Sequence, residues 1–319
     1  MGTMKRTATP LIVTFACCLL FTACQKDLCY DHNHDIEQPA KLKVVFDWSE
    51  SPDANPTNMR FMAFKTIQEK SLTVRDFGER GGGETTMEKG GYKAIGFNLN
   101  TPHIMSRGDT WATYELYTPI TTPILTQTRS ETDSEPIVQQ PDILWTGSQT
   151  GFTLSSESEE NITVPMQISV YTYVFTIKEI ENANNIRSLN ASLSGMSESM
   201  FPSTGLPSET HAIIPFTMVL KDESTLQGSV RTFGHCPENQ SEHYLEIIIK
   251  LLDGSEQIFR FDVTQQMHDA DHIITDGTGL TDIPIVISGL SLPEPPNASD
   301  RGTTISDWNS GEVIDGTMH

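Results

Sequence analysis

The stretch TVPMQISVYTYVFTI, residues 163–177, decides the fold class of this chain. It is dense in β-branched and aromatic residues, which are enriched in β-strands, and it is the strongest strand signal in the sequence. A second clear signal lies earlier, where Leu42, Val44, Phe46 and Trp48 alternate with other residues. Alternation with a period of two is typical of a strand with one buried face. Both stretches predict a β protein.

Patterns of the same kind continue along the chain. Residues 78–84 are rich in glycine and predict a turn, and residues 118–142 are rich in Thr, Pro, Ser and Gln and predict a long surface connection. Only residues 179–186 and 264–272 are expected to form short helices. Asp253-Gly254, between two apolar runs, predicts a hairpin. Further strands are predicted at residues 59–65, 71–77, 92–98, 111–117, 143–146, 188–194, 212–220, 228–233, 244–252, 257–263 and 283–287.

About a dozen strands at short intervals are typical of β-sandwiches. The scarcity of large apolar side chains at residues 118–160 predicts two of them, in residues 41–155 and 156–292. Residues 1–23 are predicted to be a signal peptide and residues 24–40 a polar tether. Residues 293–319 are predicted to be a Pro-rich spacer followed by a C-terminal strand or tail.

Composition limits the classes of function. The chain has 319 residues, of which 37% are hydrophobic, which is enough for a packed core. It carries 42 acidic against 21 basic residues, a net charge of −21. Because such a surface repels phosphate backbones, nucleic acid is not expected as a partner.

The N-terminus has the features of an export signal. Lys5 and Arg6 precede an apolar run at residues 11–21, which is too short to span a bilayer. The sequence Thr22-Ala23-Cys24 that follows resembles a bacterial lipobox, in which the cysteine becomes the lipidated N-terminus. We therefore predict lipidation at Cys24. The alternatives are an ordinary signal peptide with an incidental cysteine, or a retained membrane helix.

The residues after Cys24 bear on location and redox state. Lys26-Asp27 resembles the surface-export signal of Bacteroidetes lipoproteins, so we expect a lipid-anchored outer-membrane protein exposed at the cell surface. Apart from Cys24 and the cysteines lost with the signal, Cys29 and Cys236 remain. An oxidising compartment would permit them to form a disulfide, and the sequence leaves this open.

Short stretches spread over most of residues 24–310 resemble a Bacteroidetes group of lipoproteins of unassigned activity that is related to the fimbrillins. No single stretch is diagnostic, and the match rests on their order and spacing. They are residues 24–29, VVFDW at 44–48, GYKAIGFN at 91–98, SLSGMS at 192–197, FDVT at 261–264 and Asp307-Trp308.

This resemblance implies two tandem transthyretin-like, Greek-key β-sandwiches and a place in fimbrial or adhesion machinery. It also implies that stalk subunits polymerise by strand exchange, after cleavage at a basic residue removes the first strand. Here Lys41 and Lys43 are expected to precede the first strand, and no arginine occurs between Cys24 and Arg60. This departure fits a retained anchor or accessory subunit better than a stalk subunit.

Two clusters of His and Asp contain side chains that can bind metal ions. Residues 29–35 contain His32 and His34, and residues 268–272 place His268 and His272 four positions apart, which can bring them to one helix face. The first is expected to be a solvated tether and the second a polar loop or short helix, so no metal is predicted. The glycines of residues 78–83 lack the lysine and hydroxyl residue of a phosphate loop.

No catalytic residue and no cofactor are predicted, and the chain is expected not to be an enzyme. Residues 195–199 (GMSES) lack the second glycine of a nucleophile elbow. The leading hypothesis is a non-enzymatic outer-membrane lipoprotein, held by lipid and joined to fimbrial subunits by strand addition at a sheet edge or through residues 303–314. The alternative is a surface glycan-binding lipoprotein, which would need exposed aromatic side chains among Trp48, Trp111, Trp145 and Trp308. Trp48 lies in the apolar phase of its strand and is expected in the core.

Overall fold

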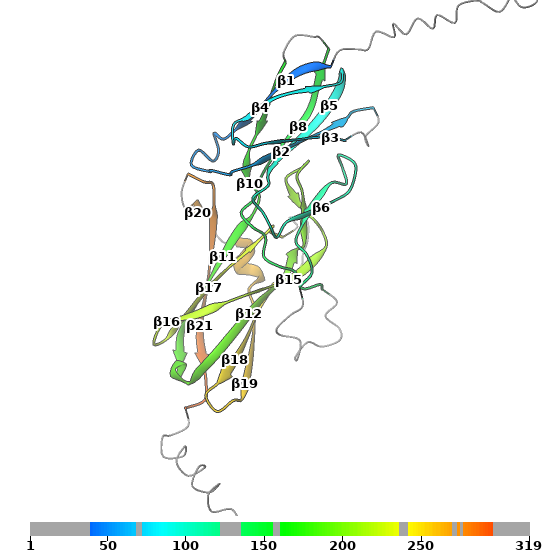
Figure 1. Cartoon of the computed structure of the whole chain (residues 1–319). Helices are drawn as coiled ribbons and strands as arrows, with labels where there is room; N and C mark the ends of the chain where they lie inside the picture. The colour runs from blue at the N-terminus through cyan, green and yellow to red at the C-terminus, as the bar shows by residue number, and fades with distance from the viewer. Residues whose placement is uncertain are drawn as a thin grey trace, which may run out of the picture. The chain divides into compact units, whose positions relative to one another are not determined.

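The computed structural model describes residues 39–67, 72–121, 135–155, 160–235, 242–269, 273–274 and 277–295. The described residues from Ala40 onward belong to one compact unit. The described residues are mostly strands, joined by turns and by one short α-helix (Figure 1). The predicted all-β sandwich class is therefore confirmed. Among these residues no helix is both long enough and apolar enough to cross a bilayer.

Two sheets come from residues 40–168, which we call the first half of the chain; the described residues after Ile168 are the second half. Their inward side chains form one hydrophobic cluster, which includes Leu42, Phe61 and Tyr92. The smaller sheet has the order β4 (Gly82–Met87), β1 (Ala40–Asp47) and β9 (Glu160–Pro165). The larger sheet has the order β10 (Gln167–Ile168), β8 (Trp145–Leu154), β5 (Gly90–Asn98), β2 (Met59–Lys65) and β3 (Leu72–Phe77).

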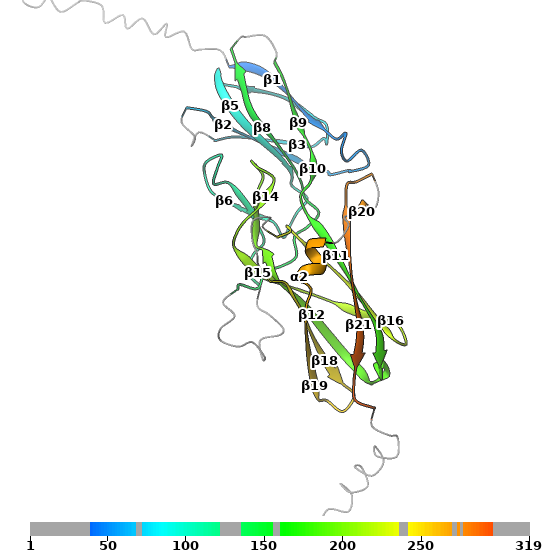
Figure 2. The same cartoon turned by 180° about the vertical axis from the view of Figure 1, so that it is seen from behind.

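Two sheets from the second half enclose another cluster, which includes Phe175, Leu193 and Ile247. The helix α2 (Thr264–Asp269), drawn in orange in Figure 2, adds the buried Met267 to it. The first sheet has the order β16 (Met218–Asp222), β17 (Thr225–Thr232), β11 (Tyr171–Glu181), β21 (Thr281–Ser291) and β20 (Ile273–Ile274). The second has the order β15 (His211–Phe216), β12 (Ile186–Ser197), β18 (Tyr244–Leu251) and β19 (Glu256–Asp262).

A fifth sheet combines strands from both halves, in the order β14 (Leu206–Pro207), β13 (Ser199–Phe201), β7 (Glu115–Tyr117) and β6 (Met105–Arg107). A third hydrophobic cluster likewise joins residues from both halves, such as Phe64 and Phe233. The division into domains at residue 155 stays a prediction. Because β9 and β10 pair with β1 and β8, sheet membership favours a boundary after Ile168.

Each half contains one parallel strand pair. β1 lies parallel to β9, and β11 lies parallel to β21, so in both halves the first strand lies beside one from the end of that half. The other pairs of named strands are antiparallel in the described part of the chain. Parallel neighbours need a long connection, and here the connection carries the intervening strands. In the first half this makes β1 an interior strand between β4 and β9.

Several predicted elements differ from those observed. Residues 163–177, predicted as one strand, contribute to three, because the chain leaves the first sheet after Pro165 and enters another at Tyr171. The helix predicted at residues 179–186 is wrong. There β11 continues to Glu181 and a 3₁₀ turn, Ala183–Asn185, follows. Glu179 and Asn182 have φ values of 58° and 59°. These lie in the left-handed region, which a right-handed helix does not adopt.

Other boundaries also moved. β4 begins inside the predicted turn at residues 78–84, and only Glu115–Tyr117 of the strand predicted at 111–117 forms. The short strand predicted at 143–146 is the ten-residue β8. The helix predicted at 264–272 is confirmed as far as Asp269, and residues 270–272 lie outside the described residues. The hairpin at Asp253-Gly254 is confirmed, with Gly254 at φ +90°.

β8 lies very close to the end of β9 at Gly147, which has no side chain. A Cβ built at Gly147 would lie 2.2 Å from the backbone oxygen of Pro165 and 2.9 Å from Met166 Sδ. We expect Gly147→Ala to lower the free energy of unfolding by about 1–3 kcal/mol, because the backbone must shift to relieve the contact. Gly151→Ala in the same strand is the control, because nothing lies within 4 Å of its Cβ position. Equal denaturation midpoints for the two variants would contradict this packing.

Candidate functional site

The first strand, β1, is the central strand of its sheet and buries every second side chain in the core. It pairs with β4 from Ala40 opposite Met87 and with β9 from Leu42 opposite Glu160. Phe46 is only 3% exposed and packs edge-on against the ring of Phe77. Lys41 and Lys43, which were expected to precede the first strand, lie within it. A cut after either lysine would therefore remove part of a buried interior strand.

Trp48, directly after β1, holds the end of this strand in place. Its indole Nε1 donates a hydrogen bond to the carbonyl oxygen of Arg80 at 2.8 Å. Its ring packs edge-on against Trp145 with centroids 6.1 Å apart, and the Arg80 guanidinium lies 5.4 Å from its centroid. Trp48 is 6% exposed, so the prediction that it belongs to the core is confirmed.

The edge strand β16 presents apolar side chains to solvent. β16 pairs only with β17 among the named strands, so its other side is the edge of its sheet. Val219 is 59% exposed and Leu220 is 43% exposed. Because neighbouring residues of a strand point to opposite faces, the edge is apolar on both faces at this point. We call Val219, Leu220 and the unpaired side of Met218–Asp222 the β16 edge.

Three other sheet edges in the described part of the chain, at β3, β15 and β19, carry protective features. β3 bears Asp76, whose carboxylate accepts two hydrogen bonds from Arg60 at 2.8 Å. β15 is covered where the backbone N–H of Ile213 donates to Pro136 at 2.9 Å. β19 exposes the charged residues Glu256, Arg260 and Asp262 together with Ile258, which is 46% exposed, and Arg260 lies over the ring of Tyr244. Charges and covering segments discourage strand addition. β16 carries its own charges, Lys221 and Asp222, only at its end, beyond the exposed Val219 and Leu220.

Three histidines meet in the second half of the chain. His235 follows β17, His243 directly precedes β18, and His268 lies in the last turn of α2. Their ring centroids are 5.0 Å apart for His235 and His243, 4.8 Å for His235 and His268, and 5.3 Å for His243 and His268. One ring nitrogen from each lies within 4.8 Å of the other two. We call these residues the three-histidine cluster.

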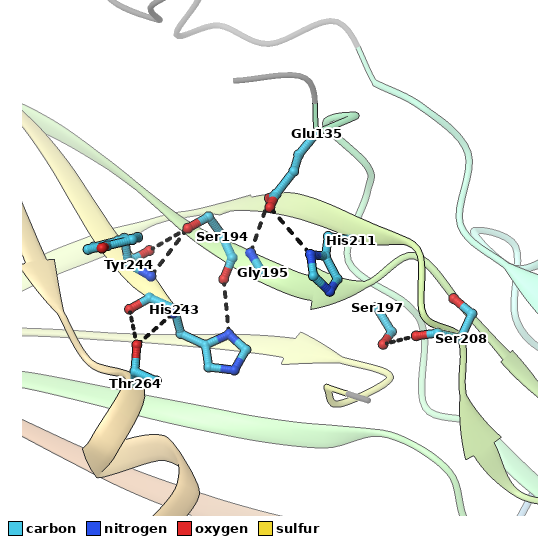
Figure 3. A network of polar contacts seen from close by, with 9 residues as sticks. All are labelled: Glu135, Ser194, Gly195, Ser197, Ser208, His211, His243, Tyr244 and Thr264. Carbon is cyan, nitrogen blue, oxygen red and sulfur yellow. Dashed lines mark hydrogen bonds and ion pairs between the residues drawn. The ribbon is translucent and has the colours of Figure 1, made fainter. Parts of the chain in front are cut away.

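His243 is the buried member of the cluster, with no exposed surface. Its Nδ1 lies 3.4 Å from the carbonyl oxygen of Ser194, and its backbone N–H donates to Thr264 Oγ1 at 2.8 Å (Figure 3). Burial and the neighbouring His235 lower the pKa of His243 from 6.5 to about 4. Its ring is therefore neutral at neutral pH.

The polar contacts around Ser194 hold this part of β12 to its neighbours (Figure 3). Ser194 Oγ accepts a hydrogen bond from the backbone N–H of Tyr244 at 3.2 Å. Glu135 accepts one from the N–H of Gly195 at 3.1 Å and lies 3.8 Å from His211 Nδ1. Gly195 needs its φ of +75°, and a Cβ there would lie 2.5 Å from a backbone oxygen. The network fixes the peptide whose carbonyl faces His243.

The structure describes only some of the residues for which the sequence predicted a role. Cys24, Cys29 and Cys236, together with His32, His34 and Trp308, lie outside the described residues, so lipidation and the disulfide stay predictions. Trp145 is buried like Trp48, and Trp111 packs edge-on against Phe64. Of the pair His268 and His272, only His268 is described, and it meets His235 and His243 instead. Ser197 donates its hydroxyl to the carbonyl of Ser208 at 2.7 Å, deep inside the fold.

Sequence comparison matches residues 23–217 to the family described as a domain of unknown function, DUF5119. The match covers more than half of the chain. It runs through the first proposed domain and into the second, as far as the residue after β15. A comparison with curated proteins found no match.

Comparison with solved structures finds adhesion-type proteins of Bacteroidetes. A candidate adhesin from Bacteroides ovatus has 18% identity and a TM-score of 0.66, covering 82% of this chain and 95% of its own. The fimbrial anchor protein Mfa2 from Porphyromonas gingivalis has 15% identity and a TM-score of 0.50, covering 78% and 90%. A candidate polysaccharide-binding protein from Bacteroides thetaiotaomicron has 11% identity and a TM-score of 0.51, covering 79% and 91%. The chain thus shares its fold with these adhesin, fimbrial-anchor and polysaccharide-binding structures.

Proposed function

The chain belongs to the DUF5119 family, and from its fold we propose that it is a non-enzymatic outer-membrane lipoprotein that anchors or accompanies a fimbria, or acts in adhesion. In this proposal lipid at Cys24 holds the protein to the membrane and a strand of a fimbrial subunit adds to a sheet edge. The fold shared with a fimbrial anchor protein and with a candidate adhesin supports it.

The observation that carries the proposal is the interior position of β1. A stalk subunit that polymerises by strand exchange loses its first strand and leaves a groove for another chain. Here β1 lies between β4 and β9 and buries Leu42, Val44 and Phe46 in the core. Retention of β1 closes that groove and leaves the protein to accept partners elsewhere, as an anchor or accessory subunit would.

The β16 edge is the proposed docking strand. An added strand would find unpaired backbone groups along Met218–Asp222 and apolar contacts at Val219 and Leu220. Backbone pairing supplies affinity and the side-chain pockets supply selectivity in this mode of recognition. Removing these two exposed side chains from water adds favourable apolar burial at the centre of the contact.

Val219→Glu should weaken binding of the fimbrial subunit by at least about 10-fold, because docking would bury an unpaired carboxylate. The thermal midpoint should stay unchanged, because Val219 is largely exposed. Ile67→Glu is the matched control, since Ile67 is 94% exposed in the turn after β2 and lies away from the β16 edge. Isolation of the variants from outer membranes, with quantification of attached subunits, measures the effect. Equal losses for both variants would rule out docking at the β16 edge.

A glycan-binding role is the second candidate, favoured by the likeness to a candidate polysaccharide-binding protein. Sugar rings stack on exposed aromatic faces, but Trp48 and Trp145 are buried, and none of the exposed large hydrophobic residues in the described part of the chain is aromatic. Isolation of the native protein from outer membranes distinguishes the candidates. Attached fimbrial subunits would support the anchor role, whereas an attached transporter with glycan-degrading enzymes would overturn it.

A further inference from the structure

The three-histidine cluster has one atom whose hydrogen bonding is incomplete. His243 Nδ1 faces the carbonyl oxygen of Ser194, which can only accept, so the neutral ring carries its proton on Nδ1. The lone pair then lies on Nε2. That atom is buried and has no hydrogen-bond partner among the described residues. A buried acceptor without a donor costs free energy, and a bound cation would satisfy it.

The other two histidine rings lie beside the ring of His243, with centroids 5.0 Å and 5.3 Å from its own. His235 Nδ1 lies 3.3 Å from the hydroxyl of Tyr173, which is itself only 1% exposed. A hydrogen bond at Nδ1 orients the ring of a metal-binding histidine and leaves Nε2 as the ligand atom. His268 comes from α2 and is exposed, so its ring can rotate toward the other two.

The spacing suits a metal ion after a small adjustment. With metal–nitrogen bonds of about 2.0–2.1 Å, tetrahedral ligand atoms lie about 3.4 Å apart. The three nitrogens lie within 4.8 Å of one another, and rotation of the exposed His268 can shorten the longest separation. Three imidazoles without a carboxylate favour zinc, copper or nickel over calcium and magnesium, which prefer oxygen.

We propose that His235, His243 and His268 bind one divalent transition-metal ion of the zinc, copper and nickel group. The three protein ligands leave a coordination position for water or a donor from a partner. The ion joins three chain segments, namely the end of β17, the start of β18 and α2. It therefore ties α2, which leads from β19 to β20, to the core of the second half.

Titration of the full chain, purified in detergent without a histidine tag, tests this proposal. Calorimetry with ZnCl₂ should give one ion per chain, and CoCl₂ should give the visible absorption bands of a low-symmetry nitrogen site. His268→Ala should weaken zinc binding by at least about 100-fold, since loss of an outer-shell partner alone costs up to about that much. Because His268 is exposed, this variant should fold normally.

Two further variants complete the test. His243→Leu should abolish binding while leaving a folded protein, because it replaces a buried ring by an apolar side chain. His103→Gln is the control, since His103 is exposed and lies beside Asp142 at 3.0 Å, away from the cluster. It should bind zinc as the wild type does. Absence of zinc binding by the wild type, or equal weakening by His103→Gln and His268→Ala, would show that the histidines only pack together and would overturn the proposal.

Discussion

Phe46→Ala should lower the free energy of unfolding by about 3–5 kcal/mol, the range typical of a buried phenylalanine cut back to alanine. Phe46 is 3% exposed in the interior strand β1, where it contacts Phe77. A Cβ at Gly96 would lie 2.6 Å from its ring, which shows how closely the ring approaches the backbone of β5. Little room exists for neighbours to collapse into the space left by the ring. Urea denaturation followed by tryptophan fluorescence would measure the loss.

Lys43→Ala in the same strand is the matched control for Phe46→Ala. Lys43 is exposed, so its variant should stay within about 0.5 kcal/mol of the wild type. A small effect for Phe46→Ala as well would mean that β1 contributes little to the core. In that case the strand could leave its sheet at low cost, and the case for a retained anchor would fail.

Cys24→Ala should abolish both fatty-acid labelling and stable membrane association. Each buried CH₂ of an acyl chain contributes about 0.8 kcal/mol, and several chains together hold a protein where one chain exchanges. Without the cysteine the signal can at most be cut as an ordinary signal peptide, which leaves a protein without lipid. Growth with radioactive palmitate, followed by separation of membranes from soluble protein, measures both effects.

Cys29→Ala provides the control for Cys24→Ala, because Cys29 lies five residues further along and outside the lipobox-like sequence. It should keep the label and the membrane association of the wild type. Labelling that persists in Cys24→Ala would contradict the lipobox assignment. Labelling lost in both variants would point to a general defect in export.

The sequence predicted the strands whose side chains alternate most clearly. β1 and β18 bury every second residue, and β18 matches its predicted range closely. β2 also matches its predicted range, although it buries four residues in a row, Phe61–Phe64. β4 was missed because GGETTM has a single buried apolar residue, Met87, and its pairing with β1 depends on the partner. The wrong helix at residues 179–186 had a plausible local pattern. Tertiary pairing kept it extended, as the hydrogen bond from Ile180 N–H to Ser224 at 3.0 Å shows.

The candidate sites were harder to predict than the fold. The residues of the three-histidine cluster lie after β17, before β18 and in α2. Because they are far apart in sequence, no short motif predicts the cluster. The sequence instead paired His268 with His272 as neighbours on one helix face. The β16 edge was also hidden, because Val219 and Leu220 are indistinguishable in sequence from core residues of a strand. Only the order of strands in the sheet shows that β16 has a single neighbour.

The parallel pairing of β1 with β9 has a consequence for biosynthesis. β1 is synthesised before the other strands of the described residues, but Glu160, which pairs with Leu42, is synthesised more than 100 residues later. Contacts between residues so distant in sequence form slowly, and an apolar strand left without neighbours tends to aggregate. A nascent chain that stalls before residue 160 thus keeps one flank of its first strand bare. The first sheet is therefore complete only in chains whose synthesis has passed β9. Chains that end before residue 160 leave β1 accessible to proteases and to chaperones that bind unfolded protein.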